Sequence, residues 1–249
     1  MDDEFDVLAA EETAIGMICL RQRGIPSEPG AVVTEITLDH QFLMSSENTA
    51  SERALAARAI AMHGGDALRV LVGGLGLGYT AHEALCSPRV ARVEVVELLT
   101  PVIEWTRKGL VPLAGELTGD PRFSVRQGDV YAELAAPPAS VSAVASRGRA
   151  GREAPKAPSS FDVILIDVDH SPDERLGPSN AGFYTVEGLR LAKRHLAPGG
   201  VLAVWSYAEC SPFADALRTA FREVHVESLR FENRVIEAEE TNWLFLARD

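Results

Sequence analysis

The chain has few cysteines and lacks any long apolar run. Three of its 249 residues are cysteines (Cys19, Cys86 and Cys210), and their spacing fits neither a disulfide framework nor a metal site. We therefore expect reduced thiols and no metal. No run of about 18 apolar residues is present, and no apolar stretch follows the acidic segment Met1–Asp6, as it would in a signal peptide. These absences predict a cytoplasmic protein without a membrane span.

Positive charge is also scarce. Lysine and arginine number 24 against 36 acidic residues, which gives a formal net charge of −12. Proteins that bind duplex DNA usually present a basic face, so we do not expect a nucleic-acid partner. An acidic surface suits a cationic substrate, and it also keeps a cytosolic protein in solution; composition alone does not separate these two readings.

The composition does support a buried core. Hydrophobic residues make up 46% of the chain, and its length fits one large domain with at most a small appendage. Residues 1–48 predict a small N-terminal β-rich domain, with strands at Ala14–Leu20, Ala31–Leu38 and Gln41–Met44. Residues 49–249 form the predicted main domain.

The main domain is predicted to be α/β, because strands and helices alternate along it. It opens with a helix in which Thr49-Ala-Ser-Glu52 has the spacing of a capping box and His63-Gly64-Gly65 ends the helix. The strands predicted next are Leu68–Val72, Val93–Glu97, Phe123–Arg126, Val163–Asp167 and Val201–Trp205. The helices predicted between and after them are Thr80–Leu85, Pro101–Leu110, Phe183–Leu196 (closed by Pro198-Gly199-Gly200) and Pro212–Phe221.

Continuously apolar strands predict a parallel, Rossmann-like sheet that helices cover on both faces. The last two predicted strands, Glu223–Arg230 and Thr241–Ala247, have no helix between them and predict an antiparallel hairpin at the sheet edge. This ending is typical of methyltransferase-type sheets. Residues 137–160 have no periodicity and predict a flexible insertion, with a role as an active-site flap or partner contact as the alternative.

The most informative motif follows the first strand of this sheet. From Val70 to Gly78 the chain reads Val-Leu-Val-Gly-Gly-Leu-Gly-Leu-Gly, a buried strand that runs into a glycine-rich turn before a helix. Glycine permits a tight turn and close approach of a ligand, and we expect the helix N-terminal amides to face that ligand. The candidate cofactor-binding residues of the turn are Gly74, Gly76, Leu77 and Gly78.

Two acids follow at the ends of the next strands. Glu97 lies about 20 residues after the glycines, where a carboxylate accepts hydrogen bonds from a ribose diol. Asp129 follows the third strand, where methyltransferase-type folds meet the adenine amino group. The turn lacks the Gly-x-Gly-x-x-Gly register of pyrophosphate-binding folds, so the pattern favours S-adenosylmethionine or a relative over NAD.

Candidate reactive residues lie at the end of the fourth strand. Asp167 and Asp169 are the candidate catalytic pair, because paired acids at a strand's carboxyl end can hold an ammonium group and accept a proton from an attacking amine. For His170 three roles stay open: general base, substrate contact, or a loop residue without a function in the site. Tyr184 and Trp205 are candidates for a pocket wall or for the core.

In order and spacing these motifs resemble the spermidine synthase family, the polyamine aminopropyltransferases, over roughly Leu38–Trp205. The matching segments are Val96-Glu97-Leu-Leu-Thr-Pro-Val102-Ile103-Glu104, Asp120-Pro121-Arg122, Gly128-Asp129, Phe161-Asp-Val-Ile-Leu-Ile-Asp167, Gly177-Pro178 and Phe183-Tyr184. The resemblance implies a Rossmann-like transferase domain behind a small β-domain, and a homodimer. It also implies that Glu97 binds ribose, Asp129 binds adenine, and Asp167 is the catalytic acid/base that holds the amine.

The chain departs from the family pattern in three places. Leu77 replaces the aspartate of the glycine motif, which in the family helps to hold the ammonium of decarboxylated S-adenosylmethionine and should repel the carboxylate of the ordinary form. The Asp-Ser-x-Asp motif has become Asp167-Val-Asp169. The stretch Asp-Glu-x-x-Tyr-His-Glu, which lines the family's polyamine site, is replaced near Glu47–Glu52 without a Tyr-His pair.

Three functional hypotheses follow. The first is transfer of an aminopropyl group from decarboxylated S-adenosylmethionine to a small-molecule amine. The second is methyl transfer from S-adenosylmethionine to an unknown small nucleophile, which Leu77 favours. The third is a catalytically silent nucleoside-binding protein, which the altered acceptor region favours.

Overall fold

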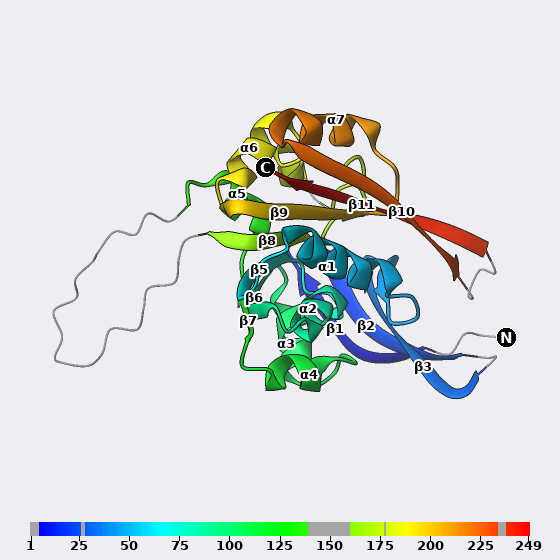
Figure 1. Ribbon diagram of the computed structural model, residues 1–249. Helices are drawn as coiled ribbons and strands as arrows, with labels where there is room; N and C mark the ends of the chain where they lie inside the picture. The colour runs from blue at the N-terminus through cyan, green and yellow to red at the C-terminus, as the bar shows by residue number, and fades with distance from the viewer. Residues whose placement is uncertain (1–4, 26–27, 139–159, 177, 234–237) are drawn as a thin grey trace, which may run out of the picture.

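The computed structural model describes residues 5–25, 28–138, 160–176, 178–233 and 238–249. Within these ranges the chain forms two β-sheets (Figure 1). The smaller one is antiparallel and consists of β1 (Asp6–Thr13), β2 (Gly16–Ile25), β3 (Glu28–Leu38) and β4 (Gln41–Ser45).

Strand β1 is absent from the sequence prediction, and the strand expected at Ala14–Leu20 begins instead at Gly16. Most β1 side chains are exposed and none is fully buried, so the strand shows no alternation of apolar and polar residues. Strand β1 is defined instead by its backbone pairing with β2, which runs from Asp6 opposite Gln22 to Thr13 opposite Gly16.

The larger sheet has seven strands in the order β10-β11-β9-β8-β5-β6-β7. Their bounds are β5 (Leu68–Gly73), β6 (Val90–Glu97), β7 (Phe123–Gln127), β8 (Phe161–Ile166), β9 (Leu196–Ser206), β10 (Glu223–Asn233) and β11 (Ala238–Arg248). Strands β5 to β9 run parallel, whereas β11 is antiparallel to both β9 and β10. The predicted Rossmann-like sheet with an antiparallel hairpin at its edge is confirmed.

Helices cover both faces of this sheet. One face carries α1 (Ala50–His63), α2 (Tyr79–Cys86), α3 (Thr100–Arg107) and α4 (Ala114–Gly119), and the other carries α5 (Val130–Ala135), α6 (Val186–Lys193) and α7 (Ser211–Ala220). Successive strand residues alternate between two hydrophobic clusters: Val70 and Val72 join the first, and Leu71 joins the second. This division explains why the strands are apolar throughout.

Several helix ends differ from the prediction. The capping box at Thr49 does not form, because the Thr49 hydroxyl accepts a bond from Arg53 Nε (3.2 Å) and makes no cap. Helix α6 starts only at Val186, where the Thr185 hydroxyl caps it by accepting from the Gly188 amide (3.1 Å). A short 3-10 helix, Pro178–Gly182, ends just before Phe183, the predicted start of this helix.

The predicted end of that helix is also wrong. Leu196 opens β9, and Pro198-Gly199-Gly200 lies inside this strand rather than after a helix. Helices α4 and α5 are missing from the prediction, because each has only six residues, which is too short for a helical period to stand out.

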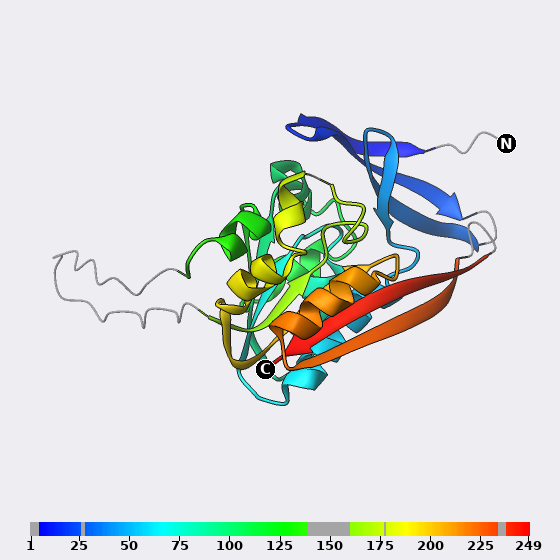
Figure 2. The same cartoon turned by 90° about the horizontal axis from the view of Figure 1, so that it is seen from above.

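Most of the predicted 137–160 insertion, residues 139–159, lies outside the described part of the chain. The division into domains at residue 48 stays a prediction; β4 ends at Ser45 and α1 begins at Ala50. Within the described ranges, no helix has both the length and the apolarity that a membrane crossing requires. Figure 2 shows the N-terminal sheet and the β10–β11 hairpin projecting on the same side of the main domain.

Candidate active site

A cavity of about 640 Å³ lies where the N-terminal sheet and the β10–β11 hairpin meet the carboxyl ends of the parallel strands. This is the edge at which open α/β sheets bind ligands. Six acidic residues line the cavity: Glu52, Glu97, Asp129, Asp167, Asp169 and Glu240. Among the described lining residues there is no lysine or arginine. The site is therefore built to receive positive charge.

The glycine turn brings the backbone close to the site. Gly74 and Gly76 line the cavity with φ angles of 90° and 50°, which other residues rarely adopt. A Cβ atom at Gly74 would collide with the backbone oxygen of Asp167, and one at Gly76 would collide with the Met44 sulfur. Glycine is thus needed here so that β5 can approach the end of β8 and the strand β4.

The amides of this turn are bonded within the protein, and the expectation that the N-terminal amides of α2 face a ligand stays a prediction. The bonds run from Gly74 N to Val96 O (3.0 Å), from Leu75 N to Glu97 Oε2 (2.8 Å), from Leu77 N to Met44 Sδ (3.3 Å) and from Gly78 N to Leu75 O (2.8 Å). Gly78 does not line the cavity. A turn whose amides are already bonded is poorly suited to pyrophosphate, which such amides would otherwise bind.

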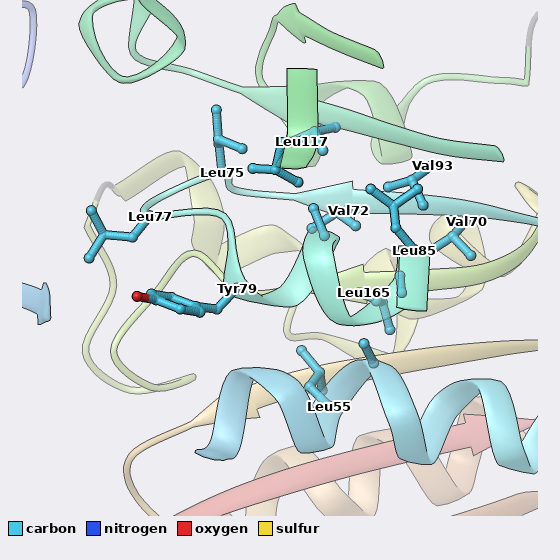
Figure 3. Close-up of a cluster of buried hydrophobic side chains, with 14 of the residues drawn as sticks. Leu55, Val70, Val72, Leu75, Leu77, Tyr79, Leu85, Val93, Leu117 and Leu165 are labelled. Carbon is cyan, nitrogen blue, oxygen red and sulfur yellow. The ribbon is translucent and has the colours of Figure 1, made fainter. Parts of the chain in front are cut away.

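Leu77 also lies off the cavity wall. Its side chain is 0% exposed and joins the hydrophobic cluster that contains Leu75 and Tyr79 (Figure 3). Leu77 therefore does not contact the cavity, and the interpretation that it relieves repulsion of a cofactor carboxylate stays a prediction. The glycine turn contributes no charge to the site.

Glu97 lies at the end of β6 and is 8% exposed. Its Oε2 accepts from Leu75 N and its Oε1 from Leu99 N (2.7 Å), and the backbone amides of Gly76 and Leu98 also bond this carboxylate. Burial raises the pKa of Glu97, and these amide bonds partly offset that rise. Glu97 also lines the cavity, and its contact with a ribose diol stays a prediction.

Asp129 also lines the cavity, where it caps the N-terminus of α5. Its Oδ1 accepts from Tyr131 N (2.9 Å) and from Ala132 N (3.2 Å). Neither bond uses Oδ2. The side chain is thus fixed by its own helix and keeps one oxygen for a ligand donor.

Asp167 follows β8 and lines the centre of the cavity. The Thr80 hydroxyl, at the start of α2, donates to its Oδ2 at 2.5 Å. Burial raises the pKa of Asp167, whereas the Thr80 bond lowers it. The raised pKa suits a group that exchanges a proton with a bound amine.

Asp169, predicted as the second catalytic acid, is buried and has four donors. Oδ2 accepts from Tyr131 and Tyr184 hydroxyls at 2.8 and 2.9 Å, and Oδ1 accepts from Leu176 N and Asn180 Nδ2 at 2.8 Å each. A carboxylate offers about four acceptor positions, so these donors saturate it. Asp169 therefore anchors the loop after β8 and is not free to act as a base.

Of the three ring-bearing candidates, two line the cavity and one does not. Tyr184 does not line the cavity; it lies behind Asp169 in contact with Tyr131. His170 and Trp205 do line it. The His170 ring packs edge-on against the Tyr207 ring, with centroids 6.4 Å apart. The Trp205 indole nitrogen is buried and has no hydrogen-bond partner in the described part of the chain.

Sequence reasoning missed two of the lining acids, Glu240 and Glu52, and it assigned Glu52 to a capping box. Glu52 is 9% exposed in the first turn of α1, and the Ser51 hydroxyl donates to its Oε2 at 2.9 Å. Burial and the charge of Asp167 raise the pKa of Glu52 to about 7. One signal was available: Glu52 shares helical spacing with the buried residues Leu55 and Ala56, which places an acid on an apolar face.

Within the described ranges, no group of three or more histidine, cysteine or acidic side chains is arranged to hold a metal ion.

No family model matches the chain. It is 31% identical over 167 residues to the polyamine aminopropyltransferase of Prochlorococcus marinus, a match that covers 67% of this chain and 47% of the relative. It is 32% identical over 163 residues to polyamine aminopropyltransferase 2 of Pseudomonas aeruginosa, covering 63% and 40%. The matches thus span less than half the length of these relatives.

The fold is similar to a solved spermidine synthase in complex with the transition-state analogue AdoDATO. The TM-score is 0.68 and the sequence identity 19%, and the likeness covers 97% of this chain and 73% of the other. At this identity the likeness establishes the fold.

Proposed function

We propose that the chain, which is similar to polyamine aminopropyltransferases and shares the fold of a solved spermidine synthase, transfers an aminopropyl group from decarboxylated S-adenosylmethionine to a small amine. The similar proteins are polyamine aminopropyltransferases, which gives the reaction class. The residues of the cavity supply the chemical argument.

One observation carries the proposal: six acids line the cavity, and there is no lysine or arginine among its described lining residues. Glu97 lies on the cavity wall at the end of β6, where a carboxylate would meet a ribose diol. Asp129 keeps one oxygen for the adenine amino group. Glu52 and Asp167 give the remaining part a pair of acids without a cation, which suits an ammonium group.

The reaction needs one proton acceptor. Decarboxylated S-adenosylmethionine supplies a carbon that is activated by the adjacent sulfonium, and methylthioadenosine is its neutral product. Asp167 accepts the proton that the acceptor amine loses, so that a lone pair becomes available on nitrogen. As the N–C bond forms, the C–S bond breaks and its electron pair remains on sulfur. Thr80 holds Asp167 through Oδ2 during this exchange.

The test is amine-dependent release of methylthioadenosine from the decarboxylated substrate, measured across a panel of diamines. We expect Asp167→Asn to lower turnover by about 10³-fold, because the base is removed. Affinity for methylthioadenosine should remain unchanged in this variant. Equal turnover in wild type and Asp167→Asn would contradict the assigned role of Asp167.

Methyl transfer from S-adenosylmethionine is the alternative. It would place the carboxylate of that molecule in a cavity with six acids and no lysine or arginine among its described lining residues. Like charges repel strongly in such a site, so this alternative is less well supported.

A further inference from the structure

We infer that Glu52, acting with Asp167, makes this cavity select a nucleoside whose side chain carries an ammonium group and no carboxylate. The inference rests on the proposed function, since it concerns the same cavity. In this inference a residue of α1, and not the glycine turn, determines which cosubstrate binds more tightly.

The position of Glu52 is fixed by two elements that are distant in sequence. The Asn242 side-chain amide on β11 donates to the Ser51 hydroxyl at 2.9 Å, and that hydroxyl donates to Glu52 Oε2 at 2.9 Å. The C-terminal hairpin therefore orients the Ser51 proton toward the carboxylate. Glu52 is nine-tenths buried and still lines the cavity, so it presents its charge to a bound ligand.

Within the described ranges, no lysine or arginine lines the cavity beside this acid. Arg53, the next residue, pairs with Glu83 (3.3 Å) and lies over the Tyr79 ring, 5.1 Å from its centroid. The charge of Arg53 lowers the pKa of Glu52 by less than burial and Asp167 raise it. Glu52 and Asp167 are thus two buried carboxylates that repel one another, and an ammonium group bound between them would stabilise both ionised forms.

The glycine turn cannot make this selection. Leu77 is fully buried away from the cavity, and the turn carries no charged side chain. A cosubstrate carboxylate near Glu52 would meet a like charge in a poorly hydrated site. We expect discrimination of about a hundredfold against it.

The test is calorimetric titration of the full chain with decarboxylated S-adenosylmethionine, S-adenosylmethionine and methylthioadenosine. Glu52→Gln should weaken binding of the decarboxylated form by about tenfold or more, because it removes a charge-assisted hydrogen bond. The same variant should leave methylthioadenosine, which has no ammonium, unchanged. The preference for the decarboxylated form over S-adenosylmethionine should shrink accordingly.

Glu47→Gln is the matched control, because Glu47 lies on the same segment, pairs with Arg23 (3.4 Å) and does not line the cavity. All three affinities should remain at wild-type values in this variant. If Glu52→Gln bound the decarboxylated form as wild type does, the inference would be overturned while the proposed function stood. If wild type bound none of the three ligands, the proposed function itself would fail.

A second measurement needs no variant. Glu52 faces Asp167 at the end of β8, Tyr79 on α2 and Arg53 on its own helix. As pH rises through about 7, Glu52 loses its proton. Affinity for the decarboxylated form should therefore rise relative to that for methylthioadenosine. A pH-independent ratio of the two affinities would contradict the inference even if Glu52→Gln failed to fold.

Discussion

The two ends of the cavity hold their acids in different ways. At the nucleoside end, Glu97 and Asp129 accept bonds from backbone amides within a few residues or on the neighbouring turn. At the amine end, Glu52 and Asp167 come from α1 and β8 and are held by the hydroxyls of Ser51 and Thr80. Backbone amides hold the first pair, whereas the second pair consists of two buried carboxylates with no lysine or arginine among the described lining residues. Under the proposed function, Glu52 and Asp167 therefore bind the ammonium group of the ligand.

The largest expected effect is on stability, and it concerns Leu77, which lies at neither end of the cavity. Leu77→Asp should lower the free energy of unfolding by about 4 kcal/mol, because it places an unpaired charge in the apolar core. It should not improve affinity for the decarboxylated form. Urea denaturation measures the loss, and Leu77→Met, which conserves volume, serves as the control with a cost below about 1.5 kcal/mol. A stable Leu77→Asp protein with improved affinity would show that position 77 does face the site.

Glu52→Gln should stabilise the free protein at high pH. The pKa of Glu52 is raised from 4.5 to about 7 in the folded state, so the folded protein retains a proton that the unfolded chain releases. Between these two values stability falls as pH rises, by up to about 3 kcal/mol in total. The variant should thus unfold at higher urea concentration than wild type at pH above 7, and match it at pH near 4.5. An equal difference at both pH values would contradict a buried, ionising Glu52.

Glu97→Gln tests the nucleoside end. It should weaken binding of methylthioadenosine, S-adenosylmethionine and the decarboxylated form alike, by about tenfold to a hundredfold, because all three share the ribose diol. Glu52→Gln should instead affect the ligands unequally. Titration of each variant with the three ligands makes the comparison. A selective effect of Glu97→Gln on one ligand would remove the distinction between the two ends.

Tyr184→Phe should have the smallest effect. It removes one of the four donors to Asp169 and leaves the Tyr131 hydroxyl in place (2.8 Å). Loss of one hydrogen bond to a charged group should cost about 1–2 kcal/mol of stability. The affinity for methylthioadenosine should change little, since Tyr184 does not line the cavity. Unchanged stability would argue against the anchoring role of Asp169.

The sequence predicts the large sheet well, because residues such as Val70, Leu71 and Val72 are apolar on both faces and the hairpin lacks an intervening helix. It predicts poorly where backbone pairing or a single hydroxyl decides the structure. Strand β1 has no buried face, and the start of α6 depends on the Thr185 cap.

The same contrast holds for the site. Glu97, Asp129 and Asp167 can be placed on the cavity from sequence, because each follows a parallel strand and such strand ends meet at one edge. Glu52 could not be placed so easily, because its role depends on a helix that packs across the sheet and on Asn242 from the last strand. The anchoring of Asp169 could not be predicted either, because its four donors are brought together only by the folding of the loop after β8 and of α5.

The most direct test of the account is calorimetric titration of the wild-type protein with decarboxylated S-adenosylmethionine and, separately, with S-adenosylmethionine. The acid-lined cavity predicts tighter binding of the decarboxylated form, by about a hundredfold. Tighter binding of S-adenosylmethionine would contradict the charge argument and would favour methyl transfer.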